Sequence, residues 1–149
     1  MSTDNTHRFN FRSAAFLVLK EEGKILLYQR KNTVHEDGNY SFVAGHLDGG
    51  ETAQQAVARE AKEEANIDIA PEDLEVVHVM HNRSPGGVEY FNVFLTPKRW
   101  SGEITNMEPD SCGDLSWFPI ADLPPNTINY IRSVLGAIEM GVFYSNFGW

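Results

Sequence analysis

Residues 45–67 read GHLDGGETAQQAVAREAKEEANI, and this stretch decides how the chain folds and which chemistry it can carry out. Its second part, residues 52–65, consists mainly of Ala, Gln, Lys, Arg and Glu, which are strong helix formers. Thr52 and Gln55 have the spacing of a capping box, and Asn66 suits the left-handed conformation that ends many helices. The stretch therefore predicts a glycine-rich loop followed by a helix over 52–65.

Three carboxylates recur along this helix with spacings of three and four residues. Glu60, Glu63 and Glu64 would share one face within an arc of about 100°. One interpretation is a solvated charged face, in which Arg59 offsets part of the repulsion. The other is a site for a hard divalent cation such as Mg²⁺, completed by a carbonyl of the preceding loop and near Glu51. Such a cation would polarise a phosphate oxygen, so this interpretation predicts chemistry on a phosphate ester or anhydride.

The length and composition favour one globular domain. The chain has 149 residues, of which 42% are hydrophobic and 22% are charged. This is long enough to close a single core without disulfides. We expect a single domain over residues 1–149, with residues 1–10 as a loose tail. No apolar run approaches the roughly 18 residues of a membrane span, and the polar N-terminus does not resemble a signal peptide.

Charge and cysteine content restrict the partners and the compartment. Twelve Lys and Arg against 21 Asp and Glu give a net charge of −9, which argues against a nucleic-acid polymer as partner. A small phosphorylated substrate remains compatible if cations bridge the negative groups. The single cysteine, Cys112, cannot form an intramolecular disulfide, and this favours a cytoplasmic location. Because His78 and His81 lie three apart on an expected strand, they do not indicate a zinc site.

Apolar and β-branched runs predict a mixed α/β domain around this helix. The second helix, over 127–140, has apolar residues at the spacing of one buried face. We expect the aromatic residues at the C-terminus to pack against the core. The expected strands are 11–21, 24–31, 40–44, 74–81, 88–98 and 114–119.

The pattern in residues 45–67 resembles the Nudix box. It has a glycine at position 45, a glutamate at position 51 and the run REAKEEANI over 59–67. The box is glycine, five residues, glutamate, seven residues, Arg-Glu, an apolar residue, any residue, Glu-Glu, any residue, glycine and an apolar residue. Asn66 replaces the final glycine, and Ala61 is a small residue at the apolar position. The resemblance implies an α/β/α sandwich with a mixed central sheet over residues 11–140.

The resemblance also implies an activity and the residues that carry it. Nudix enzymes hydrolyse a nucleoside diphosphate linked to another group, with Mg²⁺ or Mn²⁺ as cofactor. Arg59 would pair with Glu51 or with a helix glutamate and orient it. Water would attack phosphorus in line, with one glutamate or a metal-bound hydroxide as the base. The implied metal ligands are Glu60, Glu63, Glu64 and a main-chain carbonyl at Ala44 or Gly45.

Features outside the box are similar to the MutT-type branch, which acts on nucleoside triphosphates. Arg30, fifteen residues before the glycine of the box, matches a phosphate-contacting arginine, although an exposed charge at a strand end is the alternative. Phe42 matches a base-stacking aromatic residue or belongs to the core. Asn126 matches a base-reading asparagine or caps the last helix. Glu108 or Asp110 matches an acidic residue that reaches the metals or the base, or belongs to a solvated loop.

The sequence therefore predicts a Mg²⁺-dependent Nudix hydrolase that cleaves nucleoside triphosphates, normal or oxidised, to monophosphate and pyrophosphate. The second hypothesis keeps this chemistry on a nucleoside diphosphate derivative such as ADP-ribose or a nucleotide sugar. The third is a domain that senses a nucleotide without turnover. The resemblance is compatible with a homodimer, for which the aromatic C-terminus could serve.

Overall fold

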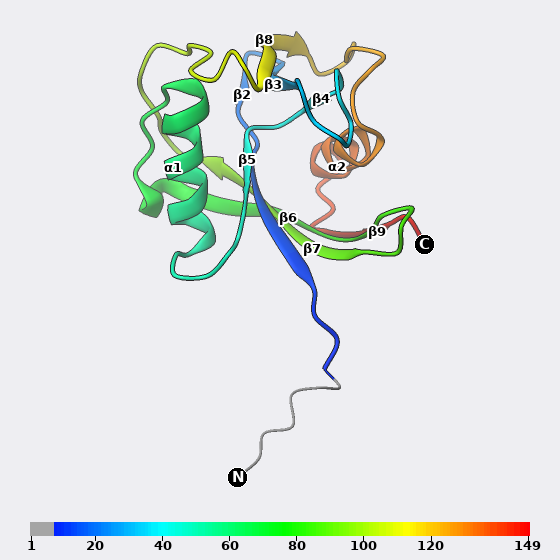
Figure 1. Ribbon diagram of the computed structural model, residues 1–149. Coiled ribbons are helices and arrows are strands. Elements are labelled where there is room, and N and C mark those ends of the chain that lie inside the picture. The colour runs from blue at the N-terminus through cyan, green and yellow to red at the C-terminus, as the bar shows by residue number, and fades with distance from the viewer. Residues whose placement is uncertain (1–7) are drawn as a thin grey trace.

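The computed structural model describes residues 8–149, so most of the loose tail expected at 1–10 lies outside the described residues (Figure 1). Two α-helices lie within the described part, together with a 3₁₀ helix, η1 (Pro71–Asp73). The helices are α1 (Ala53–Ala65) and α2 (Asn129–Glu139). The strands are β1 (Arg12–Leu17), β2 (Lys20–Glu21), β3 (Lys24–Arg30), β4 (Tyr40–Ser41), β5 (Ala44–His46), β6 (Leu74–Arg83), β7 (Glu89–Pro97), β8 (Cys112–Pro119) and β9 (Tyr144–Phe147).

The central sheet is mixed and lies between the two helices, as the resemblance implied (Figure 1). Within the described residues its strand order is β5-β1-β7-β6-β9. β1 pairs in parallel with β7 and β6 in parallel with β9, whereas the β1–β5 and β6–β7 pairs are antiparallel. Helix α1 contacts β5, β1 and β7, and α2 contacts β6 and β9. The predicted α/β/α architecture is confirmed.

A smaller sheet joins β2, β3, β4 and β8, and it explains two differences from the predicted strands. The expected strand at 11–21 is divided into β1 in the central sheet and β2 in the smaller one. The expected strand at 40–44 is likewise divided, because β4 pairs with β3 and β5 pairs with β1. In both places one continuous apolar segment passes from one sheet to the other. Hydrophobicity along the sequence does not show at which residue the hydrogen-bonded partner strand changes.

Alternate residues of β1 face two separate cores. Ala15 and Leu17 belong to the core under α1, whereas Ala14 and Phe16 belong to the core under α2. Successive side chains of a strand point to opposite faces, so a strand covered on both faces must be apolar throughout. This arrangement explains the uninterrupted apolar run of the sequence AAFLVL at 14–19.

Helix α1 has the ends that the sequence predicts. The Thr52 side chain accepts a hydrogen bond from the Gln55 backbone, and the Gln55 side chain accepts one from the Thr52 backbone. Asn66 adopts φ 58° and ψ 33°, the left-handed conformation that ends the helix. Helix α2 begins at Asn129, and its N-cap residue is Ile128, which makes no side-chain capping hydrogen bond.

The C-terminal aromatic residues pack down only in part. The backbone adds β9 to the sheet edge beside β6, and Phe147 packs against the core under α2. Phe143 and Trp149 remain 57% and 66% exposed, so the expectation that the whole aromatic end is buried is wrong. Both residues lie outside the four-residue β9, so the pairing of this strand with β6 does not bring their side chains onto the core. In the described part of the chain, neither helix is long and apolar enough to cross a membrane.

Candidate active site

Two glutamates of α1 meet beside the backbone of β5. Glu60 lies so close to Gly45 that a β-carbon at position 45 would be 2.5 Å from Glu60 Oε1. The side chain of Glu64, one turn further along α1, lies near that of Glu60, which raises its pKa, and near the Ala44 backbone, which lowers it. Glycine at position 45 therefore lets helix and strand approach closely enough to bring two carboxyl groups and the β5 backbone together.

The environment of Glu64 opposes a negative charge. The pKa of Glu64 is raised from 4.5 to about 9, first because the carboxyl group is buried and then because the charges of Glu60 and Glu108 repel it. Among the described residues, no ion pair involves Glu64. The site thus concentrates carboxyl groups at a place where the protein supplies too little positive charge to neutralise them.

The loop after β7 carries Glu108 to this place. The backbone N–H groups of Thr105 and Met107 donate to the carbonyls of Ala65 and Glu64, at 3.0 and 3.2 Å. The Glu108 carbonyl in turn accepts from the Cys112 N–H at 2.8 Å, where β8 begins. The bonds from Thr105 and Met107 satisfy carbonyls at the end of α1 that have no partner within the helix. They also fasten the acidic loop to the helix that bears the glutamates.

Asp110, the other acidic residue proposed for this loop, is exposed, and its backbone carbonyl accepts a hydrogen bond from the Asn32 side chain at 2.9 Å. Of the two candidates, Glu108 is therefore the one whose charge acts on the glutamate pair.

Arg59 joins the remaining carboxylates of the motif. Its guanidinium lies 2.6 Å from Glu51, 2.8 Å from Glu60 and 3.2 Å from Glu63. Arg59 was expected to pair with Glu51 or with a helix glutamate, and it pairs with both. The hydrogen bond from Arg59 lowers the pKa of Glu51. Because Arg59 is 40% exposed, these pairs contribute more to the orientation of the carboxylates than to stability.

The donor set fits a hard divalent cation. Mg²⁺ is usually bound by one or two carboxylates, while water and substrate phosphates supply the other ligands. Glu60 and Glu64 provide such a pair next to the backbone of Ala44 and Gly45. Within residues 8–149, no three His, Cys, Asp or Glu side chains are gathered as a ready metal site, and Glu63 is turned towards Arg59. The fit therefore rests on Glu60 and Glu64, and Glu63 would join only by leaving Arg59.

The three residues expected to contact substrate differ in their positions. Arg30 lies at the end of β3, where its Nε donates to the His35 carbonyl at 3.1 Å. Phe42 is 2% exposed and packs edge-on against Phe94, which agrees with the core alternative. Asn126 donates from its side chain to the Gly38 carbonyl at 2.8 Å. Its alternative role as the cap of the last helix is wrong, because α2 begins three residues later.

Sequence reasoning missed Tyr28 as a neighbour of the site. Burial and the charges of Glu64 and Glu108 raise the pKa of the Tyr28 hydroxyl well above its ordinary value. A tyrosine within an apolar strand is typical of a core residue, so composition did not reveal this position. The signal that could have done so is its place on β3, two residues before Arg30 and on the same strand face.

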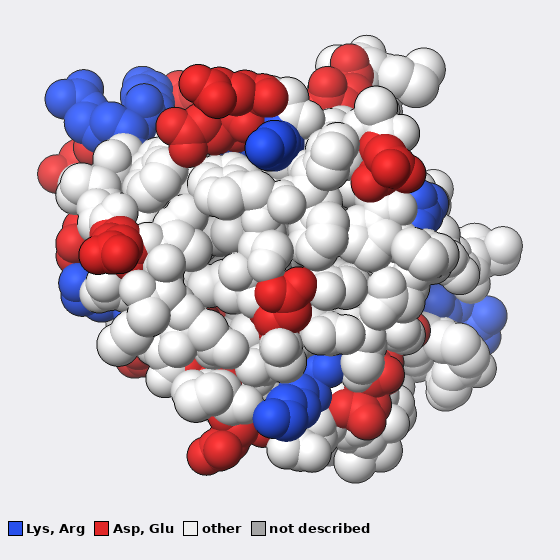
Figure 2. Space-filling model, turned by 90° about the horizontal axis from the view of Figure 1, so that it is seen from above, with Lys and Arg blue, Asp and Glu red and all other residues white. Residues whose placement is uncertain are grey.

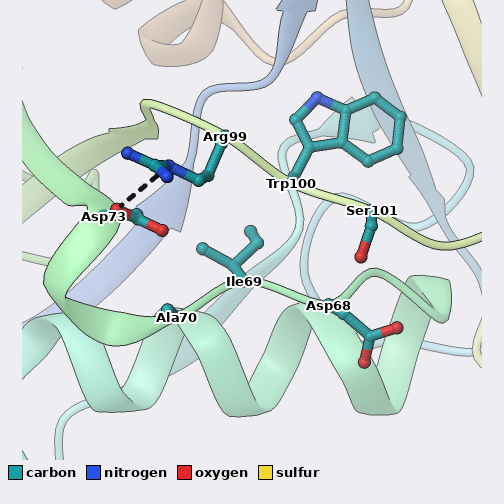
Figure 3. A pocket seen from close by; sticks show the side chains of 7 residues that line it. All are labelled: Asp68, Ile69, Ala70, Asp73, Arg99, Trp100 and Ser101. Atoms are coloured by element: carbon teal, nitrogen blue, oxygen red, sulfur yellow. Dashed lines mark ion pairs between the residues drawn. The ribbon is translucent and has the colours of Figure 1, made fainter.

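A separate pocket of about 500 Å³ lies at the C-terminal end of α1 (Figure 3). Asp73 and Arg99 form an ion pair of 3.5 Å on one side of it, and Trp100 lies on another. The remaining lining residues are Asp68, Ile69, Ala70 and Ser101. None of the glutamates of the motif lines this pocket, so the hollow and the glutamate site are different places.

Comparison with known proteins places the chain in a family. The profile of the NUDIX domain matches residues 10–135. The NAD-capped RNA hydrolase NudC of Vibrio atlanticus (strain LGP32) is 44% identical over 108 residues, which are 72% of this chain and 37% of that protein. NudC of Pseudomonas aeruginosa (strain LESB58) is 31% identical over 120 residues, 80% of this chain and 40% of that protein. The chain thus spans about two fifths of the length of these curated relatives.

Solved structures agree with this placement. A MutT NUDIX hydrolase from Burkholderia pseudomallei superposes with a TM-score of 0.77 at 27% identity, covering 86% of this chain and 98% of that one. The E. coli ORF135 protein has a TM-score of 0.72 at 21% identity, covers 89% of this chain and 91% of that one, and supports the fold alone. Because the family profile covers most of the chain and the fold agrees, this chain belongs to the Nudix hydrolase family.

Proposed function

We propose that this chain hydrolyses the pyrophosphate linkage of a small nucleotide at the site formed by Glu60 and Glu64, with Mg²⁺ or Mn²⁺ as cofactor. The observation that carries the proposal is the Glu60–Glu64 carboxyl pair, held against Gly45 without enough positive charge to neutralise it. A half-buried acidic pair of this kind is costly in a protein that has no use for it. A divalent cation and the phosphates of a substrate would supply the missing partners.

Each residue of the site has a distinct task in this proposal. A bound cation would draw charge from a phosphate oxygen and make water a better nucleophile. Glu60 and Glu64 would hold that cation, and Arg59 orients Glu60 together with Glu51. One glutamate of the motif accepts the proton of the water that attacks phosphorus. Glu108, fastened to the end of α1 by its loop, adds negative charge beside Glu64 and so strengthens the hold on the cation.

The first substrate candidate is a nucleoside triphosphate, normal or oxidised, cleaved to monophosphate and pyrophosphate. Two observations support it: the MutT structure that matches over almost its whole length, and the position of Arg30 at the end of β3. Phe42 gives no support, because it is buried in the core. Asn126 supports a base-reading role only if its bond to Gly38 is exchanged when substrate binds.

The second candidate is a nucleoside diphosphate derivative, and the sequence relatives favour it. Both relatives described above are named NAD-capped RNA hydrolases, and NAD is a diphosphate that joins two nucleosides. For this chain we propose a small dinucleotide rather than a capped RNA, because the net charge is −9. In addition, the face shown in Figure 2 carries separate acidic and basic groups on a largely uncharged surface, with one acidic group near its centre and no continuous basic surface.

Two further expectations accompany the proposal. The cytoplasmic location rests on Cys112, a free and buried cysteine. The single-domain organisation over residues 1–149 rests on length and is compatible with the two cores that share the central sheet.

The experiment that tests the function is a product analysis over a panel of nucleotides. Purified protein with Mg²⁺ is incubated with normal and oxidised triphosphates, ADP-ribose, nucleotide sugars and NAD, and the products are separated by chromatography. Pyrophosphate with a monophosphate from a triphosphate supports the first candidate, and two monophosphates from NAD support the second. Tight binding of one nucleotide without any turnover would contradict both and indicate a sensing domain.

A further inference from the structure

The pairing of β3 with β8 is irregular next to Arg30. Gln29 has Asp114 as its register partner and Arg30 has Cys112, so the register passes over Gly113. One strand thus contributes an extra residue, as in a β-bulge. Bulges bend the strand, redirect neighbouring side chains and are frequent beside active sites. This one lies at the end of β3 that carries the candidate phosphate-binding arginine.

The glycine in this bulge makes room for the side chain of Gln29. A β-carbon at position 113 would lie 2.9 Å from Gln29 Oε1 and 3.5 Å from its Cδ. Because φ at position 113 is not in the left-handed region, the backbone conformation itself does not require glycine. Glycine inside a strand often marks a close approach of other atoms. Here the atoms that approach belong to Gln29.

The Gln29 side chain holds the loop between β3 and β4. Its Nε2 donates to the Gly38 carbonyl at 3.0 Å, and the Asn126 side chain donates to the same carbonyl at 2.8 Å. Two donors thus engage both lone pairs of this oxygen. The Gly38 N–H donates to the Arg30 carbonyl at 2.8 Å, so the point that is held is the point at which loop 31–39 returns to β3.

The same loop holds the guanidinium of Arg30. The His35 carbonyl accepts from Arg30 Nε at 3.1 Å and from the Thr33 hydroxyl at 2.9 Å. Among the described residues, neither Nη group of Arg30 has a hydrogen-bond partner. The loop therefore fixes one donor of the guanidinium and leaves the outer donors for an anion, and phosphate is an anion that suits their fork geometry.

Arg30 lies on the same side as the glutamate site. Burial and the charges of Glu64 and Glu108 raise the pKa of the Tyr28 hydroxyl, whereas the positive charge of Arg30 lowers it. The hydroxyl of Tyr28 is thus within reach of both the glutamates and the arginine. A nucleotide bound through a cation at the glutamates would have its phosphates near this arginine.

We propose that Gln29 is a positioning residue for substrate binding: through the Gly38 carbonyl it holds loop 31–39, and through this loop the Arg30 guanidinium, ready for a substrate phosphate. This inference rests on the proposed function, because Arg30 is given a task only by a nucleotide. Successive side chains of β3 point to opposite faces, so Gln29 acts without touching the phosphate that Arg30 binds. A guanidinium that is already held loses less conformational freedom on binding.

The first test is a double-mutant cycle between Gln29 and Arg30. Gln29→Met keeps the length of the side chain and removes the donor. It should lower kcat/KM by roughly 3–30-fold when Arg30 is present and by less than about 2-fold in the Arg30→Ala background. The loss should lie mainly in KM. Gln54→Met in α1 is the matched control, because it makes the same exchange outside this network, and it should keep the wild-type kcat/KM.

The second test reaches the same contact from the other strand. Gly113→Ala should displace the Gln29 amide and cause a similar loss of kcat/KM, again only when Arg30 is present. Hydrogen exchange of the Gly38 N–H, measured without nucleotide, should become faster in Gln29→Met and in Gly113→Ala but not in Gln54→Met. This measurement follows the hold on the loop separately from catalysis.

Three results would overturn the proposal. They are equal losses with and without Arg30, a wild-type kcat/KM in Gln29→Met despite faster exchange at Gly38, and a wild-type kcat/KM in Arg30→Ala. A wild type that cleaves no nucleotide would contradict the proposed function instead. The cycle is then measured as the Kd of ADP with Mg²⁺, since ADP carries the diphosphate common to both substrate candidates. Non-additive losses of affinity would support the role of Gln29, and additive losses would overturn it.

Discussion

Glu60 lies against the backbone of Gly45 so closely that a β-carbon at position 45 would be 2.5 Å from Glu60 Oε1 and 2.6 Å from its Cγ. This contact brings α1 and β5 together at the point where Glu60 lies close enough to Glu64 to raise its pKa. The glycine that begins the motif and the glutamate fifteen residues later are therefore two parts of one arrangement. The spacing in the sequence reflects the path of the chain from β5 through a loop and back along α1.

Gly45→Ala should lower the rate of hydrolysis strongly while the protein remains folded. The new methyl group would displace the Glu60 carboxylate, and φ at position 45 is not in the left-handed region, so the backbone tolerates alanine. Gly136→Ala in α2 is the matched control, because a β-carbon there meets no atom within 4 Å. It should keep full activity and raise the free energy of unfolding by about 0.5–1 kcal/mol. Steady-state kinetics and thermal unfolding of both variants provide the test.

Arg59→Lys should reduce kcat by roughly 10–100-fold and raise the concentration of Mg²⁺ needed for half-maximal activity. A lysine ammonium cannot replace the planar guanidinium that reaches Glu51, Glu60 and Glu63 together. The midpoint of thermal unfolding should change little, since these pairs are partly exposed. Titration of activity with Mg²⁺ is the measurement, and an unchanged half-maximal concentration would speak against an orienting role.

The stability of the metal-free protein should fall as the pH rises from about 4.5 towards about 9. The pKa of Glu64 is 4.5 in the unfolded chain and about 9 in the folded one, so over this window the folded state binds more protons. Stability decreases with pH wherever the unfolded state binds fewer protons. Unfolding curves with EDTA should show this slope, and Glu64→Gln should flatten it. Addition of Mg²⁺ should reduce it too, and a metal-free wild type with the slope of Glu64→Gln would contradict the prediction.

Asn126→Ala separates the two roles of this residue. Loss of the hydrogen bond to the Gly38 carbonyl should lower the free energy of unfolding by about 1 kcal/mol. If Asn126 only fastens the loop that contains Gly38, KM should change by the same factor for every nucleotide. If it also reads the base, the ratio of kcat/KM between two bases should change. Kinetics with a purine and a pyrimidine triphosphate distinguish these outcomes.

Much of the fold followed from local patterns, and the site followed from one motif. Helix α1, its capping box and Asn66 depend on interactions within a few residues, and the structure confirms them. The division of the strands between two sheets depends on partners far away in the sequence, such as Val18 donating to the Leu95 carbonyl, and periodicity does not encode such partners. Tyr28 is near the site for the same reason, because the end of β3 lies beside the loop of Glu108, where the Lys31 N–H donates to the Ser111 carbonyl.

The substrate-binding residues were harder to predict, because each candidate could equally have a structural role that the sequence pattern did not exclude. Phe42 packs in the core against Phe94, and Asn126 binds the Gly38 carbonyl.

The assignment of Glu60 and Glu64 as the active site is tested most directly by Mg²⁺-dependent hydrolysis by the wild type, Glu60→Gln and Glu64→Gln, on the nucleotide that the wild type cleaves fastest. Glu72→Gln, on the exposed surface, serves as the control. Each site variant should lose roughly 10²–10⁴-fold in kcat while the control keeps the wild-type rate. Mg²⁺ should also raise the unfolding temperature of the wild type more than that of either site variant. Near-normal turnover in both Glu60→Gln and Glu64→Gln would contradict the assignment of the site.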